Sequence, residues 1–238
     1  MNFKGVFIQY KKWFFLVALS IIWGSSFILI KKSLTGLEPL QLGALRLLFS
    51  GAMILFFGAR LIRNISKKQW PWVMWSAILG TFFPSFLFAI AETEIDSAVA
   101  SILNGLVPLN TILFGFAIFK IGSTKRQLIG VLVGFVGTAL LIGYGAQFNP
   151  QQNYYYAGFI ILSTLMYAAN INIIKKHLQE MTALTIAAGN FILLMIPACI
   201  ILVVSGFFEN DTYRSDAVLT SMGYVIILSL FGTALAKV

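Results

Sequence analysis

Eight long apolar runs constrain this sequence more than any other feature. They lie near residues 13–30, 39–58, 70–91, 98–119, 127–144, 156–174, 183–205 and 217–236. Each run is close to the roughly 20 residues that a helix needs to cross about 30 Å of hydrocarbon. Lipid cannot satisfy free backbone groups, and runs this long without two-residue alternation are helices rather than barrel strands. The sequence therefore predicts an all-α polytopic membrane protein with eight transmembrane helices.

The composition agrees with a membrane protein. Hydrophobic residues make up 59% of the chain and charged residues 11%, whereas soluble domains have about 45–50% and about 25%. A net charge of +9 could suggest a nucleic acid, but the bases form short clusters between apolar runs instead of one tail or face. We expect the lipid bilayer, not a nucleic acid, as the partner. The single Cys199 is expected to be a buried filler, and neither a cofactor nor a metal site is predicted.

The basic residues between the runs indicate the orientation, because Lys and Arg accumulate on the cytoplasmic side. With a cytoplasmic N-terminus, thirteen of the seventeen bases fall inside and three outside, whereas seven of the eight acids fall outside. We therefore expect a multi-pass protein of the plasma (inner) membrane with its N-terminus in the cytoplasm. The remaining base, Arg46, lies within a predicted span.

The sequence also repeats itself at a distance of 144 residues. Residues 23–34 (WGSSFILIKKSL) align with residues 167–178 (YAANINIIKKHL), so the first span corresponds to the sixth. Since a unit of five spans is odd, the second copy must cross the membrane upside down. The predicted units are residues 1–144, with five spans, and residues 145–238, which end after their third span. The expected architecture is an inverted repeat of five-helix units, with eight of an expected ten helices present.

Four blocks of sequence resemble a known family: WGSSF in the first span, ALRLLFSG in the second, ASILNGLVPLNT in the fourth and QLIGVLVGFVGTALL in the fifth. In this order and at these positions they are similar to EamA-type members of the drug/metabolite transporter superfamily. The resemblance covers the chain from about residue 13 to Val238. It implies a ten-helix fold of two inverted repeats and a carrier of small metabolites, often an exporter.

Arg46 is a candidate for the substrate site. It lies seven residues after Pro39, so a rise of about 1.5 Å per residue puts it about 10 Å below the outer end of its helix. A charge at this depth needs a partner or water, which favours a role in binding an anionic or carboxylate-bearing group. The alternative is a side chain that extends to the outer headgroups. Its repeat counterpart, Asn190, is a second candidate.

Asn104 and Pro108 stand four residues apart on one face of the fourth span. Proline leaves the carbonyl four positions back without its helical donor, which exposes a backbone acceptor beside the Asn104 amide. Polar groups on one face of a kinked helix favour a substrate pocket. Hydrogen bonding between helices is the alternative.

Trp23 and Ser26 share a face of the first span, and their counterparts Tyr167 and Asn170 share a face of the sixth. In each pair the aromatic ring could stack on a substrate while the polar group orients it, so all four are candidate substrate-binding residues. The neighbouring residues 24–25 (Gly-Ser) favour close helix packing instead.

The acidic residues offer little chemistry at membrane depth. Glu92, Glu94 and Asp96 follow the third span, which Pro84 is expected to break, and we expect them in a solvated outer loop that enforces topology, with cation collection as the alternative. All the acids are then in loops and His177 stands alone. A membrane enzyme would need paired carboxylates, a His–acid set or a metal cluster, so we do not predict an enzyme.

These features predict a secondary transporter that exports small organic metabolites or drugs by alternating access around a mid-membrane site. One alternative is a non-transporting remnant or a membrane assembly subunit. A membrane enzyme acting on lipid-linked substrates is the weaker alternative. Substrate, coupling ion and oligomeric state do not follow from the sequence.

Overall fold

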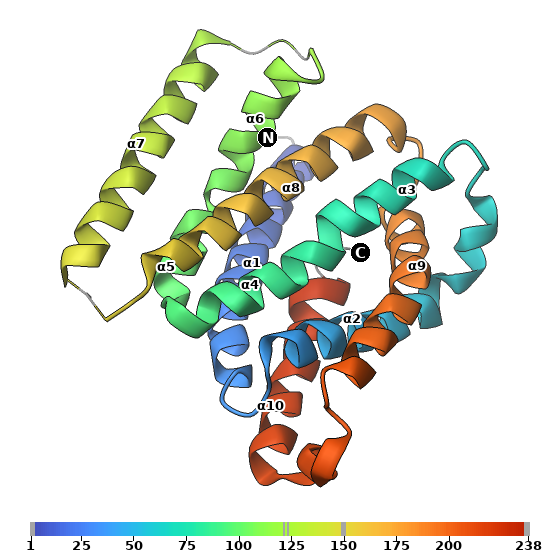
Figure 1. Cartoon of the computed structure of the whole chain (residues 1–238). Coiled ribbons are helices and arrows are strands. Elements are labelled where there is room, and N and C mark those ends of the chain that lie inside the picture. The colour runs from blue at the N-terminus through green and yellow to red at the C-terminus, as the bar shows by residue number, and fades with distance from the viewer. Residues whose placement is uncertain (1–2, 121, 123, 149–150, 236–238) are drawn as a thin grey trace.

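The computed structural model describes residues 3–120, 122, 124–148 and 151–235, with side chains described except at 3–12, 146–148 and 210–212. Within these residues eight helical segments of 19 to 26 residues are long and apolar enough to cross a membrane. They confirm the predicted all-helical, eight-span architecture (Figure 1). Residue 236, the predicted end of the last span, lies outside the described residues.

The spans are numbered in chain order, and several consist of more than one helical element. Three spans are single α-helices: span 1 is α1 (Phe3–Ser33), span 5 is α7 (Lys125–Phe148) and span 7 is α9 (Ala183–Val204). Span 2 is α2 (Pro39–Gly58), continued by η1 (Ala59–Asn64), and span 3 consists of α3 (Trp70–Ala77), η2 (Ile78–Phe82) and α4 (Phe83–Glu94). Span 4 consists of α5 (Ser97–Asn104) and α6 (Leu106–Ala117), span 6 of η3 (Tyr154–Tyr156) and α8 (Ala157–His177), and span 8 of α10 (Asp216–Ile227) and η5 (Leu228–Ala234), preceded by η4 (Glu209–Arg214).

Capping side chains fix where several helices begin. Thr182 and Ser215 precede α9 and α10, and each side-chain oxygen accepts a backbone N–H of the first turn. Proline at the first position begins α2, where its missing N–H costs nothing. These ends place the polar connectors outside the apolar segments.

Spans 3 and 4 are irregular at their centres. In span 4 the helix is interrupted at Gly105, whose N–H bonds to the Ile102 carbonyl at 3.0 Å, three residues back. This confirms the kink predicted just before Pro108. The break expected at Pro84 is wrong, because span 3 continues through the π segment η2, and α4 begins directly afterwards with Pro84 in its first turn.

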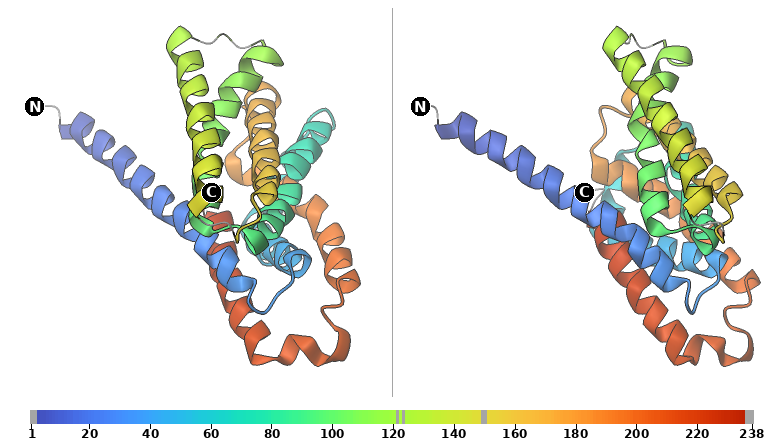
Figure 2. Two further views of the ribbon diagram at one scale, coloured as in Figure 1. Left: turned by 60° about the vertical axis from the view of Figure 1, so that its left-hand side comes forward. Right: turned by 90° about the vertical axis from the view of Figure 1, so that its left-hand side faces the viewer.

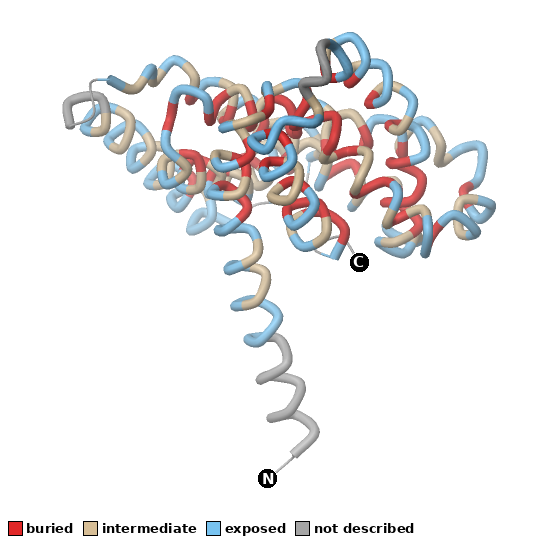
Figure 3. The backbone as a smooth tube through the Cα atoms, turned by 90° about the horizontal axis from the view of Figure 1, so that it is seen from below, coloured by how far each residue is buried: buried red, intermediate tan, exposed pale blue. Residues whose placement is uncertain are grey.

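The helices exchange partners between the two predicted repeat units. Span 2 packs most extensively along its counterpart, span 7. Span 1 packs against span 8, and its counterpart span 6 packs against span 3. Figure 3 shows buried positions gathered where these helices meet, including the fully buried Leu42 and Leu47 of α2 and Phe191 of α9. Figure 2 shows α1 extending away from the other helices toward its N-terminus, while α6 and α7 run side by side.

Two predictions about packing are wrong. A Cβ atom added at Gly24 would meet nothing within 4 Å, and Ser25 is exposed, so this pair does not mediate close helix contact. Cys199 is also exposed rather than a buried filler. The reason is the same in each case: in an apolar helix, a small or apolar residue has the same sequence signal on the lipid-facing side as in the core.

Candidate functional site

The described residues form a cavity of about 460 Å³ between spans 1, 2, 3, 4, 6 and 8. Sites for small molecules commonly have about 300–1,000 Å³. Six of the eight predicted site residues line it: Trp23, Ser26, Arg46, Asn104, Pro108 and Tyr167. The other lining residues, which were not predicted from the sequence, are Phe27, Ile30, Gly80, Thr81, Ser85, Phe88, Gly105, Val107, Ile171, Gly232 and Thr233.

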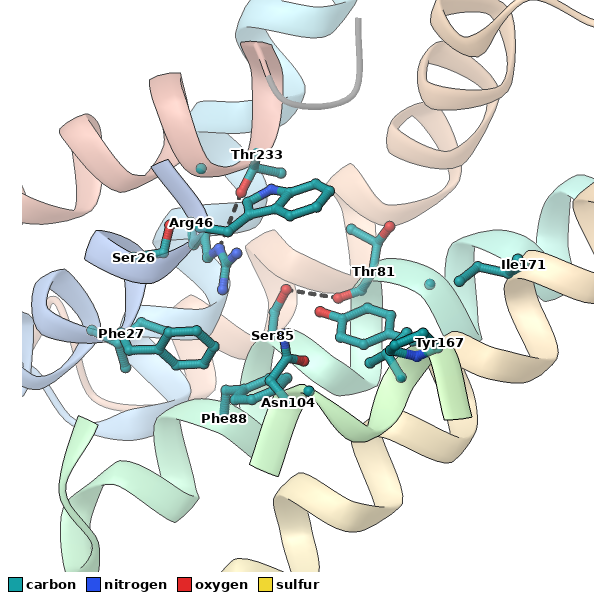
Figure 4. A pocket seen from close by; sticks show the side chains of 17 residues that line it. Ser26, Phe27, Arg46, Thr81, Ser85, Phe88, Asn104, Tyr167, Ile171 and Thr233 are labelled. Carbon is teal, nitrogen blue, oxygen red and sulfur yellow. Dashed lines mark hydrogen bonds between the residues drawn. The ribbon is translucent and has the colours of Figure 1, made fainter. Parts of the chain in front are cut away.

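Arg46 supplies the positive charge of the cavity wall. Its Nε donates a hydrogen bond to Thr233 Oγ1 at 3.2 Å, which ties α2 to η5. Within the described part of the chain this is the one hydrogen bond of its guanidinium. Figure 4 shows the head group directed into the cavity, so the structure does not show the alternative of a side chain extended to the headgroups. The terminal nitrogens are therefore available for a bidentate contact with a carboxylate.

Aromatic rings from three helices form the apolar part of the wall. The Phe88 ring on α4 lies edge-on to Phe27 of α1, with centroids 5.7 Å apart, and stacks on Tyr167 of α8 at 6.1 Å. Trp23 is 49% exposed, which places it at the rim of the cavity. Such a wall suits the flat, apolar body of a small molecule.

Asn104 contributes an unused acceptor. It is the last residue of α5, directly before the interruption at Gly105. Its Oδ1 is buried and has no hydrogen-bond partner among the described residues. Buried polar atoms are nearly always paired, so an unpaired one on a cavity wall indicates a place where a ligand or water can donate.

The two π segments line the cavity with the same dipeptide. Gly80 and Thr81 lie in η2 of span 3, and Gly232 and Thr233 lie in η5 of span 8. π turns are rare and are frequent at functional sites. This Gly-Thr pair, present once in the third span of each predicted unit, is the sequence signal that could have identified these residues.

Each π-segment glycine allows a polar side chain to approach closely. A Cβ at Gly232 would lie 2.5 Å from Ser26 Oγ, and one at Gly80 would overlap the Asn170 amide. Ser26 and Asn170 are predicted counterparts, and each approaches the third span of the other unit. The contact of span 1 with span 8 and that of span 6 with span 3 are therefore built alike, with a polar side chain against a π-segment glycine. The repeat itself stays a prediction.

Asn170 and Asn190 do not line the cavity. Asn170 lies against Gly80, and its Oδ1 has no partner among the described residues. Asn190 is 5% exposed, and the amide orientation that satisfies all its partners donates to the Val73 and Ile186 carbonyls and accepts from Ser76 Oγ at 3.2 Å. Sequence spacing predicted the depth of each residue in the membrane, but neighbouring helices decide which way a side chain points.

Glu92 is not in a solvated loop, so that prediction is wrong, although Glu94 and Asp96 are exposed as expected. Glu92 lies in the last turn of α4 with 0% exposure. The helix extends past the apolar run, and at its end Lys31 Nζ donates to the carbonyls of Glu92 at 2.6 Å and Ile95 at 3.1 Å. A cation at the carbonyl end of a helix is stabilising, so Lys31 has a structural role at the end of α4.

Comparison with known proteins identifies the family of this chain. The sequence model of the EamA-like transporter family matches residues 11–143, more than half of the chain. The chain belongs to this family. An uncharacterized transporter of Archaeoglobus fulgidus is 25% identical over 94% of this chain and 76% of the relative. The uncharacterized inner membrane transporter YedA of Escherichia coli is 24% identical over 93% and 70%.

A third relative has a more specific name. The probable amino-acid metabolite efflux pump of Salmonella typhimurium is 25% identical over 71% of this chain and 55% of its own length. The family and the names of these relatives identify this EamA member as a multi-pass membrane transporter. The cavity is accordingly the first place to look for its substrate.

Proposed function

We propose that this EamA-family chain is a secondary transporter that exports a small organic carboxylate with a flat, apolar body. The observation that carries the proposal is Arg46, a charged side chain inside the bundle whose terminal nitrogens face the cavity. Placing Arg at membrane depth costs a few kcal/mol or more, so a charged side chain there is a functional candidate. An anionic group bound to Arg46 would neutralise the charge.

The remaining lining supports the same ligand. The rings of Phe27, Phe88 and Tyr167 offer stacking surface, and the unpaired Asn104 Oδ1 offers an acceptor for a second polar group. The name of the Salmonella relative, which refers to an amino-acid metabolite, also fits a carboxylate. The ligand of this proposal thus has an acid group at one end and a ring beside it.

The proposed cycle is alternating access, in which the helices around the cavity open it first to one side and then to the other. The excess of basic residues in alternate loops supports an inner-membrane location with a cytoplasmic N-terminus. The efflux named for one relative supports export as the direction.

A binding screen tests the ligand class. Thermal stabilisation of the purified chain is measured with a panel of aromatic carboxylates and with the matching neutral carboxamides. We expect the carboxylates to stabilise the protein more than the amides, and Arg46→Ala to abolish the difference. Arg60→Ala is the matched control, because Arg60 is exposed in η1, which continues the same span.

Flux of a binding carboxylate in proteoliposomes, with a gradient applied in each direction, then tests transport and export. Equal stabilisation by acids and amides in the unaltered protein would rule out Arg46 as an anion site.

A further inference from the structure

A buried carboxyl group lies one helical turn from the cavity wall. Glu92 follows the lining residue Phe88 by four positions on α4, and its side chain has 0% exposure. An ionised carboxylate shielded from water is costly unless cations or hydrogen-bond donors serve its oxygens. Oε1 of Glu92 has no hydrogen-bond partner among the described residues. The site as built is therefore poorly suited to a carboxylate anion.

The Ser97 hydroxyl group indicates what completes the site. Its Oγ lies 2.9 Å from Glu92 Oε2 and 3.0 Å from the Phe27 carbonyl oxygen, and both contacts have hydrogen-bond geometry. A hydroxyl carries one hydrogen, so it can donate to only one of these acceptors at a time. If Oε2 carries a proton, the carboxyl donates to Oγ and Oγ donates to the Phe27 carbonyl. Both contacts are then hydrogen bonds.

The cations near Glu92 do not replace that proton. Lys31 directs its Nζ to two backbone carbonyls, and Arg46 bonds to Thr233 across the cavity. In the described part of the chain these are the bases whose charges act on the carboxyl group. Among the described residues, the titratable and charged groups on the elements packed against this end of α4 are Lys31 and Lys32 on α1, Arg46 on α2, Asp96 at the start of α5, Tyr167 on α8 and Tyr154, Tyr155 and Tyr156 of η3.

We propose that Glu92 binds a proton and that the protonated carboxyl holds span 1 against the turn between spans 3 and 4. The proton comes from water when this end of the bundle is open. When it is bound, the chain of hydrogen bonds from Glu92 through Ser97 to the Phe27 carbonyl joins α4, α5 and α1. When it leaves, Ser97 donates to the carboxylate and releases Phe27, and the charge draws water between the helices.

This inference deepens the proposed function by naming a proton as the second ligand, and it rests on that function for its place in a transport cycle. Phe27 and Phe88 line the cavity on either side of the link, so closing span 1 also closes one end of the substrate space. Under the predicted topology that end faces the outside.

Infrared difference spectroscopy tests proton binding directly. As the pH is raised, the carbonyl stretch of a protonated, buried carboxyl group should disappear from the unaltered protein. Glu92→Gln, a neutral isostere, should lack this band at every pH. Glu94→Gln is the matched control, because Glu94 is exposed two residues further along α4, and it should retain the band. A band of unchanged intensity in Glu92→Gln would overturn the proposal.

Distance measurements test the closure. Nitroxide labels are attached at K32C and A98C, both exposed positions, in a Cys199→Ser background that removes the single native cysteine. We expect the distance distribution to move to longer values as the pH rises, and Glu92→Gln to keep the short distribution throughout. A pH response in Glu92→Gln equal to that of the unaltered protein would contradict the proposal.

A second variant covers the case in which Glu92→Gln does not fold. Ser97→Ala keeps the carboxyl group and removes its hydrogen-bond partner, so the band should persist at a shifted frequency and the closure at low pH should be lost. An unshifted band with normal closure would again overturn the proposal. None of these measurements needs a substrate, so their failure is distinguishable from a failure to bind carboxylates.

Discussion

Arg46 and Asn190 occupy aligned positions of the two predicted repeat units, yet they do different things. Each lies on the second span of its unit, and each faces the third span of the other unit. Arg46 uses only Nε, on Thr233, and leaves the rest of its guanidinium to the cavity. Asn190 is buried, with both ends of its amide engaged by α3 and its own helix. Aligned positions of the two predicted units thus hold a side chain that faces the cavity in one unit and a packing side chain in the other.

The difference arises from the surroundings of each side chain. Thr233 lies in a π segment beside Gly232, and both residues line the cavity together with Arg46. Ser76 lies in regular helix α3, before the π segment of its own span begins, and it is fully buried. Aligned positions of the two predicted units can therefore differ, with a charged side chain at a cavity in one unit and a buried amide in the other.

Replacing Arg46 by the residue type at the aligned position, Arg46→Asn, should have the largest effect. Hydrogen bonds to a charged group contribute about 1.5–3 kcal/mol, so affinity for a binding carboxylate should fall about 10- to 150-fold. Titration of the purified variant with the best carboxylate of the screen measures the loss. An affinity within about twofold of the unaltered protein would mean that the two positions do not differ in binding.

The second largest effect is expected from a substitution that fills the space between Gly232 of η5 and Ser26. In Gly232→Ala the new Cβ would lie 2.5 Å from Ser26 Oγ, and overpacking of this kind costs about 1–3 kcal/mol. Gly223→Ala in α10 is the control, because its Cβ would meet nothing within 4 Å. Reversible unfolding in detergent should show a loss for the first variant alone, and adding Ser26→Ala should restore part of it.

Removing the buried amide of Asn190, in Asn190→Ala, should have the smallest effect. Interhelical hydrogen bonds in membrane proteins average about 0.6 kcal/mol, with a maximum of about 1.7 kcal/mol. We expect a stability loss in that range, no change in carboxylate affinity, and coupling to Ser76→Ala in a double-mutant cycle. A drop in affinity instead would show that Asn190 reaches the substrate after all.

The eight spans could be predicted from the sequence because lipid forces each crossing segment to be long, apolar and helical. Most of the polar candidates also line the cavity, since a polar residue at membrane depth needs a reason to be there. The aromatic wall could not be found in this way. Phe27 is 8% exposed and Phe56 is 83% exposed, yet both are phenylalanines within apolar runs. Glu92 was misplaced because the apolar run ends before the helix does.

The π segment η2 also sets the rotational phase of α4, the helix that continues span 3. A π turn carries one more residue than an α turn, and one residue turns a helix by about 100°. Without the extra residue in η2, α4 would present a different side of its cylinder to the bundle. Phe88 and Glu92, which lie on one side of α4, would both swing out of register with the cavity. A single inserted residue, at a distance from the carboxyl group, thus decides whether that group faces protein or lipid.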